Sequence, residues 1–277
     1  MSPEDIAFRL ILRKIERSSS LDFTHYKDKC LKRRLRVRLR ALDIHSYKEY
    51  FDFLQNNDKE MNTLIDTITI NVTQFFRDYT AFKYLQSNLF VPYSEDKNLF
   101  KLRIWSAACS SGEEPYSIAI ALREAFGRKI ERVKIDIFAT DIDDKSLEIA
   151  ERGIYPAKNL RVLLDKEPEI IPKYFDKQKD GNYKIKDSIK EMIQFKKRDL
   201  IKDAHFTRIN ILFCRNLFIY FEKTLQEEIL KKFHNDLINN GYLVLGKVET
   251  ILGIGESYFR SLSVKERVYK KRLRSEK

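Results

Sequence analysis

Apolar residues recur three or four positions apart through most of the first 70 residues. This spacing places them on one face of a helix, and it predicts four successive helices. The first begins near Ile6 and ends at the serines of residues 18–20, and the second follows the leucines from Leu31 to Leu42. Ser46 can cap the third helix, and the fourth covers residues 59–68. Because this part contains no glycine, we expect a small all-helical domain over residues 1–72.

From residue 102 onward, short β-rich runs alternate with helical patterns. Residues 102–108 and 133–139 are typical of buried strands, and each is followed by a helical repeat that ends at a glycine, Gly127 or Gly153. A strand at 209–214, a long helix at 222–239, a strand at 242–246 and a hairpin within 264–273 complete the pattern. Alternating strands and helices predict an α/β domain over residues 73–277, with parallel strands and right-handed crossovers.

The alternation breaks between residues 155 and 199. Asp180 and Gly181 form a turn signal, and short alternating runs occur at residues 183–186 and 192–195. We interpret this segment as a small antiparallel β insertion, at about residues 156–198, within the α/β domain.

Composition indicates an ordinary globular protein, since 43% of the 277 residues are hydrophobic and 34% are charged. No apolar run reaches the roughly 18 residues of a membrane-spanning helix, and the N-terminus lacks a secretory pattern, so we expect a cytoplasmic protein. The three cysteines are widely spaced, and none of the four histidines has a second ligand at metal-binding spacing. We therefore expect neither a disulfide framework nor a metal.

The net charge of +12 is concentrated in two segments, residues 27–40 and 265–277. In the first, a leucine stripe is buried and turns the arginines outward to varying degrees. Guanidinium groups bind carboxylates and phosphates in two-point fashion. A solvated face, an acidic helix, a nucleic-acid backbone and a membrane surface all remain open as interpretations of this arginine helix.

Three polar clusters follow predicted strands, at Ser110–Glu114, Asp141–Asp143 and Arg215–Asn216. Ligands of open α/β sheets bind outside the carboxyl ends of the strands, and an acid after the second strand can hold ribose hydroxyls. The first loop has one glycine and two carboxylates, which disfavours a pyrophosphate. An uncharged or cationic nucleoside fits better, and S-adenosylmethionine is the common example.

Each cluster also has a purely structural interpretation. Asp141 can cap the following helix, Glu113 and Glu114 can be acids at a helix amino terminus, and Asn216 can stabilise a turn. The occurrence of all three clusters at strand ends favours a functional role.

Five longer segments carry a more specific pattern. They are Asn71-Val-Thr-Gln-Phe-Phe-Arg77, Trp105-Ser-Ala-Ala-Cys-Ser-Ser-Gly-Glu-Glu-Pro-Tyr-Ser117, Ala139-Thr-Asp-Ile-Asp143, Gly153-Ile-Tyr155 and Phe213-Cys-Arg-Asn-Leu-Phe-Ile-Tyr-Phe221. Together they resemble the CheR-type chemotaxis receptor methyltransferases, which use S-adenosylmethionine to esterify receptor glutamates. The resemblance runs through nearly the whole chain. It implies a Rossmann-like methyltransferase domain with the small β insertion, preceded by the all-α domain.

The resemblance also implies roles for individual residues. Arg77 and Tyr220 would flank the reacting centre, and Arg34, Arg38 and Arg40 would bind the substrate. The cofactor would be S-adenosylmethionine, with S-adenosylhomocysteine as product. Its pocket would be lined by Asn71, Thr73, Arg77, Glu114, Asp141, Asp199, Leu200, Asn216 and Leu217.

Two positions depart from the family pattern. The family usually has asparagine where Asp199 stands, and its Gly-His-Ser-Glu segment is here Gly246-Lys-Val-Glu249. The first departure would replace an amide contact to the adenosine by a charged one, and the second leaves the role of that loop open.

The implied partner is the acidic helical bundle of chemotaxis receptors, which a cationic helix would attract and orient. We expect no nucleic-acid partner, no membrane insertion and a monomer. Two alternatives remain. A nucleic-acid methyltransferase would suit the positive charge, but amino-group methylation of bases commonly uses a proline after the Asn216 position, where Leu217 stands. A non-catalytic module that binds S-adenosylmethionine would not need Arg77 and Tyr220.

Overall fold

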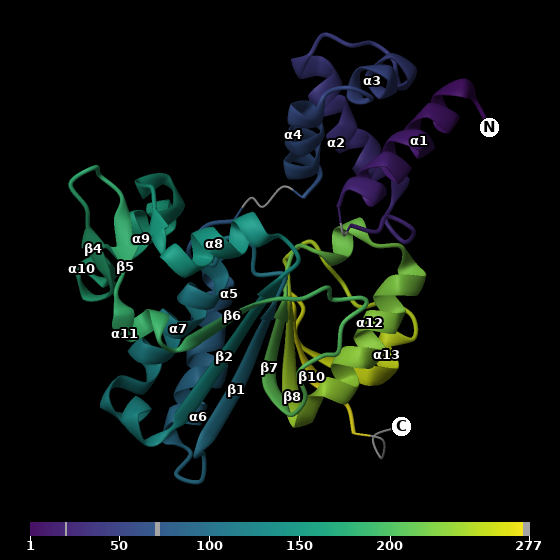
Figure 1. The fold of residues 1–277 in the computed structure, drawn as a ribbon. Helices are drawn as coiled ribbons and strands as arrows, with labels where there is room; N and C mark the ends of the chain where they lie inside the picture. Colours follow the sequence, from purple (N-terminus) through teal and green to yellow (C-terminus); the bar gives the residue numbers. More distant parts are fainter. Residues whose placement is uncertain (20, 70–72, 274–277) are drawn as a thin grey trace. The chain divides into compact units, whose positions relative to one another are not determined.

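The computed structural model describes residues 1–19, 21–69 and 73–273 (Figure 1). The chain divides into two compact units. The first unit contains Met1–Ile70 and Tyr220–Gln226, and the second contains Asn71–Ile219 and Glu227–Lys277. The boundary predicted at residue 72 lies outside the described residues and stays a prediction.

The N-terminal part of the first unit is all-helical, as the apolar spacing predicts. Its helices are α1 (Pro3–Ser18), α2 (Asp28–Ala41), α3 (Tyr47–Leu54) and α4 (Asp58–Ile68). Ser46 accepts a hydrogen bond from the backbone N–H of Glu49 (3.1 Å), which confirms the predicted cap of α3. The core side chains of this unit come from the predicted apolar stripes, and Ile11, Leu35 and Leu64 are fully buried.

The segment Tyr220–Gln226 packs into the same unit. The backbone N–H of Lys27 donates to the carbonyl of Tyr220 (2.8 Å), and that of Glu222 donates to the carbonyl of His25 (2.9 Å). The ring of Phe221, only 1% exposed, meets the ring of Tyr26 edge-on with centroids 5.1 Å apart. A stretch far from the N-terminus in sequence therefore completes the helical unit.

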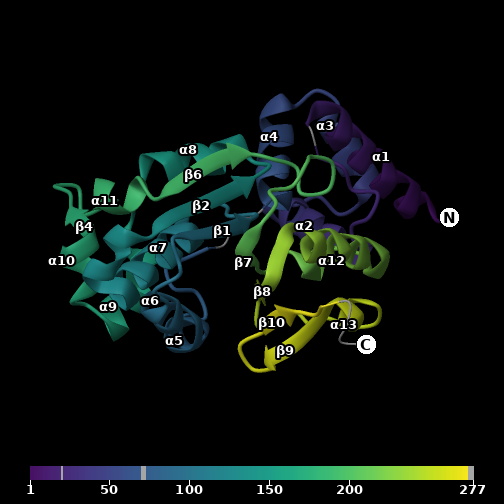
Figure 2. The ribbon, with the colours of Figure 1, turned by 90° about the horizontal axis from the view of Figure 1, so that it is seen from below.

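The second unit is built on a seven-stranded sheet in the order β6-β2-β1-β7-β8-β10-β9 (Figure 2). The strands are β1 (Lys101–Ala107), β2 (Lys134–Asp141), β6 (Ile193–Lys197), β7 (Ile209–Cys214), β8 (Leu237–Leu245), β9 (Phe259–Ser263) and β10 (Val268–Lys271). Strands β6, β2, β1, β7 and β8 are parallel, and β10 and β9 add antiparallel pairings. This is the predicted Rossmann-like arrangement.

The main helices of the second unit follow the strands as predicted. They are α7 (Glu113–Phe126), α8 (Asp144–Arg152) and α12 (Lys223–Asp236), the last of which starts in the first unit. A further helical stretch, α5 (Tyr79–Leu85), a π-helical turn (Gln86–Phe90) and α6 (Val91–Glu95), precedes β1 and was not predicted. Shorter helices are α9 (Arg161–Lys166), α10 (Ile170–Tyr174), α11 (Asp187–Lys190) and α13 (Gly255–Tyr258), and 3₁₀ turns cover Gly127–Arg132, Ala157–Leu160 and Phe218–Tyr220.

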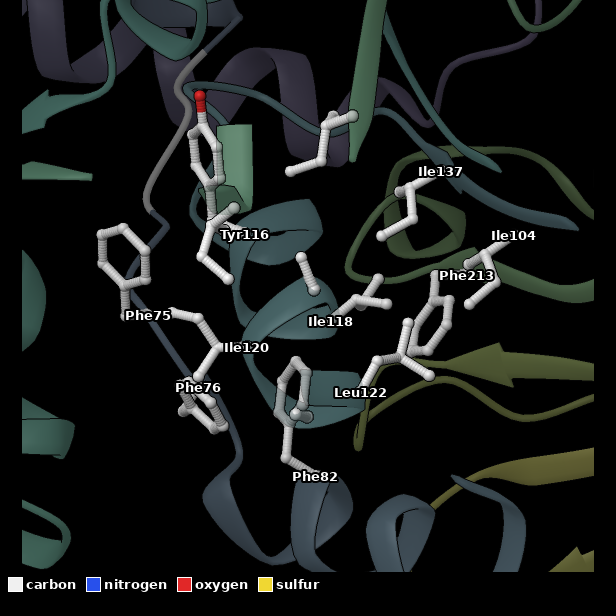
Figure 3. Packing of buried hydrophobic residues seen from close by; sticks show 14 of the residues in the cluster. Phe75, Phe76, Phe82, Ile104, Tyr116, Ile118, Ile120, Leu122, Ile137 and Phe213 are labelled. Atoms are coloured by element: carbon white, nitrogen blue, oxygen red, sulfur yellow. The ribbon is translucent and has the colours of Figure 1, made fainter. Parts of the chain in front are cut away.

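The buried face of α7 forms the centre of the core (Figure 3). Ile118 and Leu122 are fully buried among sheet residues such as Ile104 and Phe213 and the aromatic ring of Phe82. The continuous apolar character of β1 and β7 is explained by this burial on both faces, which is typical of parallel strands.

The small antiparallel sheet exists, but one of its predicted strands belongs elsewhere. Its strands are β3 (Ile154–Tyr155), β5 (Tyr183–Ile185) and β4 (Phe175–Lys177), in that order, and the Asp180–Gly181 turn joins β4 to β5. The run at 192–195 instead forms β6, which pairs in parallel with β2 at the edge of the large sheet. Alternation alone could not distinguish these partners, because an edge strand with one exposed face has the same period of two.

Two further boundaries differ from prediction near the C-terminus. The long helix ends at Asp236 rather than at 239, and β8 begins at Leu237. The final hairpin pairs β9 with β10, so its first strand precedes the predicted range. The described part of the chain contains no helix that is both long and apolar enough to cross a membrane.

Candidate active site

The predicted polar clusters lie at the carboxyl ends of β1, β2 and β7 in the second unit. From β1 the chain continues to β2 and β6 on one side, and then to β7 and β8 on the other. The point between β1 and β7 is therefore the topological switch point, where open α/β sheets bind their ligands.

The loop after β1 has an unusual backbone. Ala108, Ser110 and Gly112 all have positive φ, at 60°, 51° and 93°. A Cβ atom on Gly112 would lie 2.7 Å from the Cβ of Ala150 in α8, so only glycine permits this approach of the loop to α8. The buried hydroxyl oxygen of Ser110 has no hydrogen-bond partner among the described residues, which leaves a polar atom available to a ligand.

Asp141 at the end of β2 fixes this loop. Its Oδ2 accepts from the backbone N–H of Ser110 (2.7 Å), and its Oδ1 accepts from that of Asp143 (3.0 Å). Burial raises the pKa of Asp141, and these two N–H bonds act in the opposite direction. The cap of α8 is Asp143, whose side chain accepts from the N–H of Lys145. Asp141 is thus free of the capping role that the sequence left open.

Glu114 lies in the first turn of α7 and is linked to β7. Its Oε1 accepts from the hydroxyl of Ser106 (2.7 Å), and its Oε2 lies 3.2 Å from Nη1 of Arg215. Arg215 also donates through Nη2 to Oδ2 of Asp78 (2.7 Å) and to the carbonyl of Arg77 (2.9 Å). Sequence reasoning named Arg215 only as part of a polar pair. Its position, with a side chain only 3% exposed, makes it the link between three segments of the site.

The backbone at the end of β7 is held by Glu249. Asn216 has a positive φ of 62°. The carboxylate of Glu249 accepts from the backbone N–H groups of Asn216 (2.8 Å), Phe218 (2.7 Å) and Gly246 (2.6 Å). Burial raises the pKa of Glu249, and these bonds oppose the shift. The Gly246–Glu249 segment, whose role the sequence left open, therefore shapes the Asn216 turn.

Asp199 and Leu200 follow β6. The Oδ1 atom of Asp199 accepts from the N–H groups of Ile201 (2.7 Å) and Lys202 (3.2 Å). An asparagine side chain could accept the same two bonds through its own Oδ1, so the departure at this position is compatible with the turn. The carbonyl of Leu200 is bound by His205 (2.8 Å).

The remaining predicted pocket residues are Asn71, Thr73, Arg77 and Leu217. Thr73, Arg77 and Leu217 are half-buried in the second unit, and Asn71 lies outside the described residues. The placement of these residues around a cofactor stays a prediction.

Tyr220 and the arginine helix belong to the first unit. The hydroxyl of Tyr220 accepts from Nη2 of Arg34 (3.0 Å). Its assignment to the reacting centre stays a prediction.

The arginines of α2 fall into two groups. Arg38 binds Glu60 in two-point fashion, with Nε–Oε1 at 2.9 Å and Nη2–Oε2 at 2.7 Å, and its side chain is 18% exposed. Tyr50 donates to the same carboxylate (2.6 Å). Arg40 is exposed, in line with the predicted outward face. Four exposed residues at helical spacing form a surface that we call the basic stripe, namely Lys29, Arg33, Arg36 and Arg40.

Comparison with known proteins agrees with these features. Residues 71–268 match the family model described as CheR methyltransferase, SAM binding domain, and residues 6–69 match the CheR methyltransferase, all-alpha domain. A chemotaxis protein methyltransferase of Borreliella burgdorferi is 33% identical over 251 residues, which cover 88% of this chain and 87% of that protein.

A chemotaxis protein methyltransferase of Salmonella typhimurium is 34% identical over 252 residues, which cover 88% of this chain and 84% of that protein. The order of the two family models along the chain agrees with an all-helical part followed by the sheet. The chain belongs to the CheR methyltransferase family, and its cofactor is S-adenosylmethionine.

Proposed function

We propose that this protein transfers a methyl group from S-adenosylmethionine to glutamate side chains of chemotaxis receptors, releasing S-adenosylhomocysteine. The observation that carries the proposal is the pair of carboxylates, Glu114 and Asp141, at the switch point of a sheet in a CheR methyltransferase. The relatives named chemotaxis protein methyltransferase support the choice of receptors as substrates.

The residues at the switch point suit this cofactor. S-adenosylmethionine supplies, when bound, a methyl group on a positively charged sulfur that is already a good leaving group. Carboxylates favour a cationic ligand and disfavour phosphates. The hydroxyl of Ser110, which has no partner within the described parts of the chain, offers a further polar contact. We propose that the pocket is lined by Asn71, Thr73, Arg77, Glu114, Asp141, Asp199, Leu200, Asn216 and Leu217.

The reaction needs little from the protein beyond orientation. A glutamate side chain has a reference pKa of about 4.3 and is ionised at neutral pH, so no residue has to remove a proton. One carboxylate oxygen forms the new O–C bond as the S–C bond breaks, and the positive charge of sulfur is neutralised. Alignment of oxygen, carbon and sulfur can lower the barrier by roughly 7–11 kcal/mol. Arg77 is proposed to orient the incoming carboxylate through a two-point contact.

The test is incubation of the full chain with methyl-labelled S-adenosylmethionine and receptor-containing membranes, followed by alkaline treatment. Glutamate methyl esters release volatile labelled methanol, and this is the expected result. Label that stays bound to nucleic acid after alkali would identify a nucleic-acid methyltransferase instead. An absence of transfer, with S-adenosylhomocysteine still bound, would identify a non-catalytic binding module.

A further inference from the structure

The loop between β6 and β7 is fixed by side chains rather than by a backbone ladder. Residues 198–208 form no helix or strand, and four of their carbonyl groups accept from nitrogen-bearing side chains. The donors His205, Lys232, Arg198 and Arg103 bind the carbonyls of Leu200 (2.8 Å), Ile201 (2.7 Å), Ala204 and Thr207 (2.5 Å), respectively. The carbonyl of Leu200 is therefore held by His205, while the side chain of Asp199 binds the backbone of the same turn.

His205 differs from the other donors because both of its ring nitrogens are engaged. Nε2 faces the carbonyl of Leu200, and Nδ1 lies 2.7 Å from Oδ2 of Asp236 in α12. The two side chains are only 7% and 9% exposed. A carbonyl oxygen and an ionised carboxylate are both acceptors, so both contacts require the doubly protonated imidazolium. A neutral ring has one N–H and would turn a lone pair toward one of the two oxygens.

Other charged groups lie on the elements that pack around the pair, and they make the following contacts. On α12, Lys232 is directed to the loop carbonyl of Ile201. On β10, Lys271 donates to the carbonyl of Leu237 (2.6 Å) and interacts electrostatically with Asp236. On the loop and β1, Arg198 and Arg103 bind loop carbonyls.

Two aromatic rings also lie beside His205. The rings of Trp105 and Phe233 have centroids 5.1 and 5.9 Å from that of His205. Among the described contacts of His205, Asp236 is thus the carboxylate that compensates an imidazolium at this position.

We propose that His205, as an imidazolium paired with Asp236, is a positioning residue for the cofactor. It holds Leu200, and with it the Asp199–Leu200 turn, in the conformation that binds the nucleoside part of S-adenosylmethionine. This inference rests on the proposed function, in which Asp199 and Leu200 line the cofactor pocket. Loss of the proton from His205 breaks one of its two contacts and lowers cofactor affinity.

The test is calorimetric titration of the full chain with S-adenosylhomocysteine between about pH 6 and about pH 9, the range that brackets histidine titration. The dissociation constant of the unmodified protein is expected to rise about tenfold with pH, which corresponds to one charge-assisted hydrogen bond.

In Asp236→Asn, the amide can donate to Nδ1 of a neutral ring whose Nε2–H still binds Leu200. This variant is expected to bind with little dependence on pH. His234→Gln, on the same helix but in contact with the carbonyl of Arg272, is the matched control and should keep the unmodified profile.

A second readout comes from Trp105, the one tryptophan of the chain. An adjacent imidazolium quenches indole emission more strongly than a neutral imidazole does. Emission of the unmodified protein is expected to rise with pH at the same midpoint as the loss of affinity, and to stay level in Asp236→Asn. This signal reports the protonation of His205 without any cofactor present.

The possible results separate the inference from the proposed function. Binding of S-adenosylhomocysteine with a pH profile that is flat, or that is the same in Asp236→Asn, overturns the role of His205 alone. Absence of binding at every pH overturns the proposed function and this inference with it.

Discussion

Glu113 and Glu114 are adjacent in sequence, yet their carboxylates have different environments. Glu114 faces Ser106 and Arg215 at the carboxyl ends of the strands. Glu113 is fully buried and accepts from the Ser111 hydroxyl (2.8 Å) and the Asn159 amide (2.5 Å). The helical pattern alone describes both as acids at a helix amino terminus, because the direction of a side chain depends on which elements pack around it. Only the family resemblance singled out Glu114 as a pocket residue.

This difference predicts unequal effects of the same substitution. Glu114→Gln removes a negative charge from the proposed cofactor pocket, so the dissociation constant of S-adenosylmethionine is expected to rise about tenfold, as for loss of one charge-assisted contact. Glu113→Gln, the matched control, is expected to leave affinity within about twofold, since its carboxylate faces Ser111 and Asn159. Calorimetry on both variants, with melting curves to confirm folding, checks this. Equal losses of affinity would contradict the assignment of Glu114.

The roles of some site residues could be predicted from the sequence, and the role of one could not. Arg77, Asp141 and Asn216 could be named from motifs, since each occurs in a specific segment. Glu249 could not be given a role, because its three N–H partners come from two loops that only the parallel pairing of β7 and β8 brings together.

Among the elements, those with strong periodicity were predicted well and those with a choice of partner were not. The four N-terminal helices and the strands β1, β2 and β7 carry their own pattern of apolar residues. β6 was assigned to the wrong sheet, because pairing is decided by the rest of the fold. The arginines of α2 were predicted to turn outward to varying degrees, and the pattern could not show that the buried Glu60 on α4 binds Arg38.

The basic stripe on α2 is proposed to bind the acidic receptor helices. Reversal of charge in Arg36→Glu/Arg40→Glu is expected to lower kcat/KM for receptor methylation about tenfold or more by repulsion, with affinity for S-adenosylhomocysteine unchanged. Arg34 and Arg38 are left intact, because their contacts with Tyr220 and Glu60 lie within the unit. The control is Lys97→Glu/Arg128→Glu, which alters the net charge by the same amount at two exposed basic residues of the second unit. This double variant should retain activity. Equal losses in the two double variants would show that only net charge matters.

The molecule as a whole has two units that do not correspond to two continuous pieces of chain. The chain passes from the first unit to the second after residue 70, returns for Tyr220–Gln226 and leaves again. The order of a helical part and a sheet part was predictable from local patterns. The return of Tyr220–Gln226 to the helical unit could not be predicted from local patterns, because it depends on the tertiary contact of Phe221 with Tyr26.

This return predicts the behaviour of a cut chain. Residues 1–72 and 73–277, produced together as separate pieces, are expected to copurify, because Phe221 is buried against the helical residues. Phe221→Asp places a charge in that contact and should abolish copurification. The control is Phe53→Asp, because Phe53 belongs to the same unit but is 40% exposed. This variant should still copurify. Separation of the unmodified pieces would contradict the assignment of Tyr220–Gln226 to the helical unit.

The membership of Tyr220–Gln226 also limits how such proteins can recombine. A chimera that takes its first 70 residues from one relative and the remainder from another would join the helices of one parent to the Tyr220–Gln226 segment of the other. The backbone bonds of His25 and Lys27 to that segment would survive, but the fit of the Tyr26 and Phe221 rings would not be inherited together. A functional exchange of the helical part therefore needs three junctions. One follows residue 70, and the other two lie on either side of Tyr220–Gln226, so that this segment comes from the same parent as the helices.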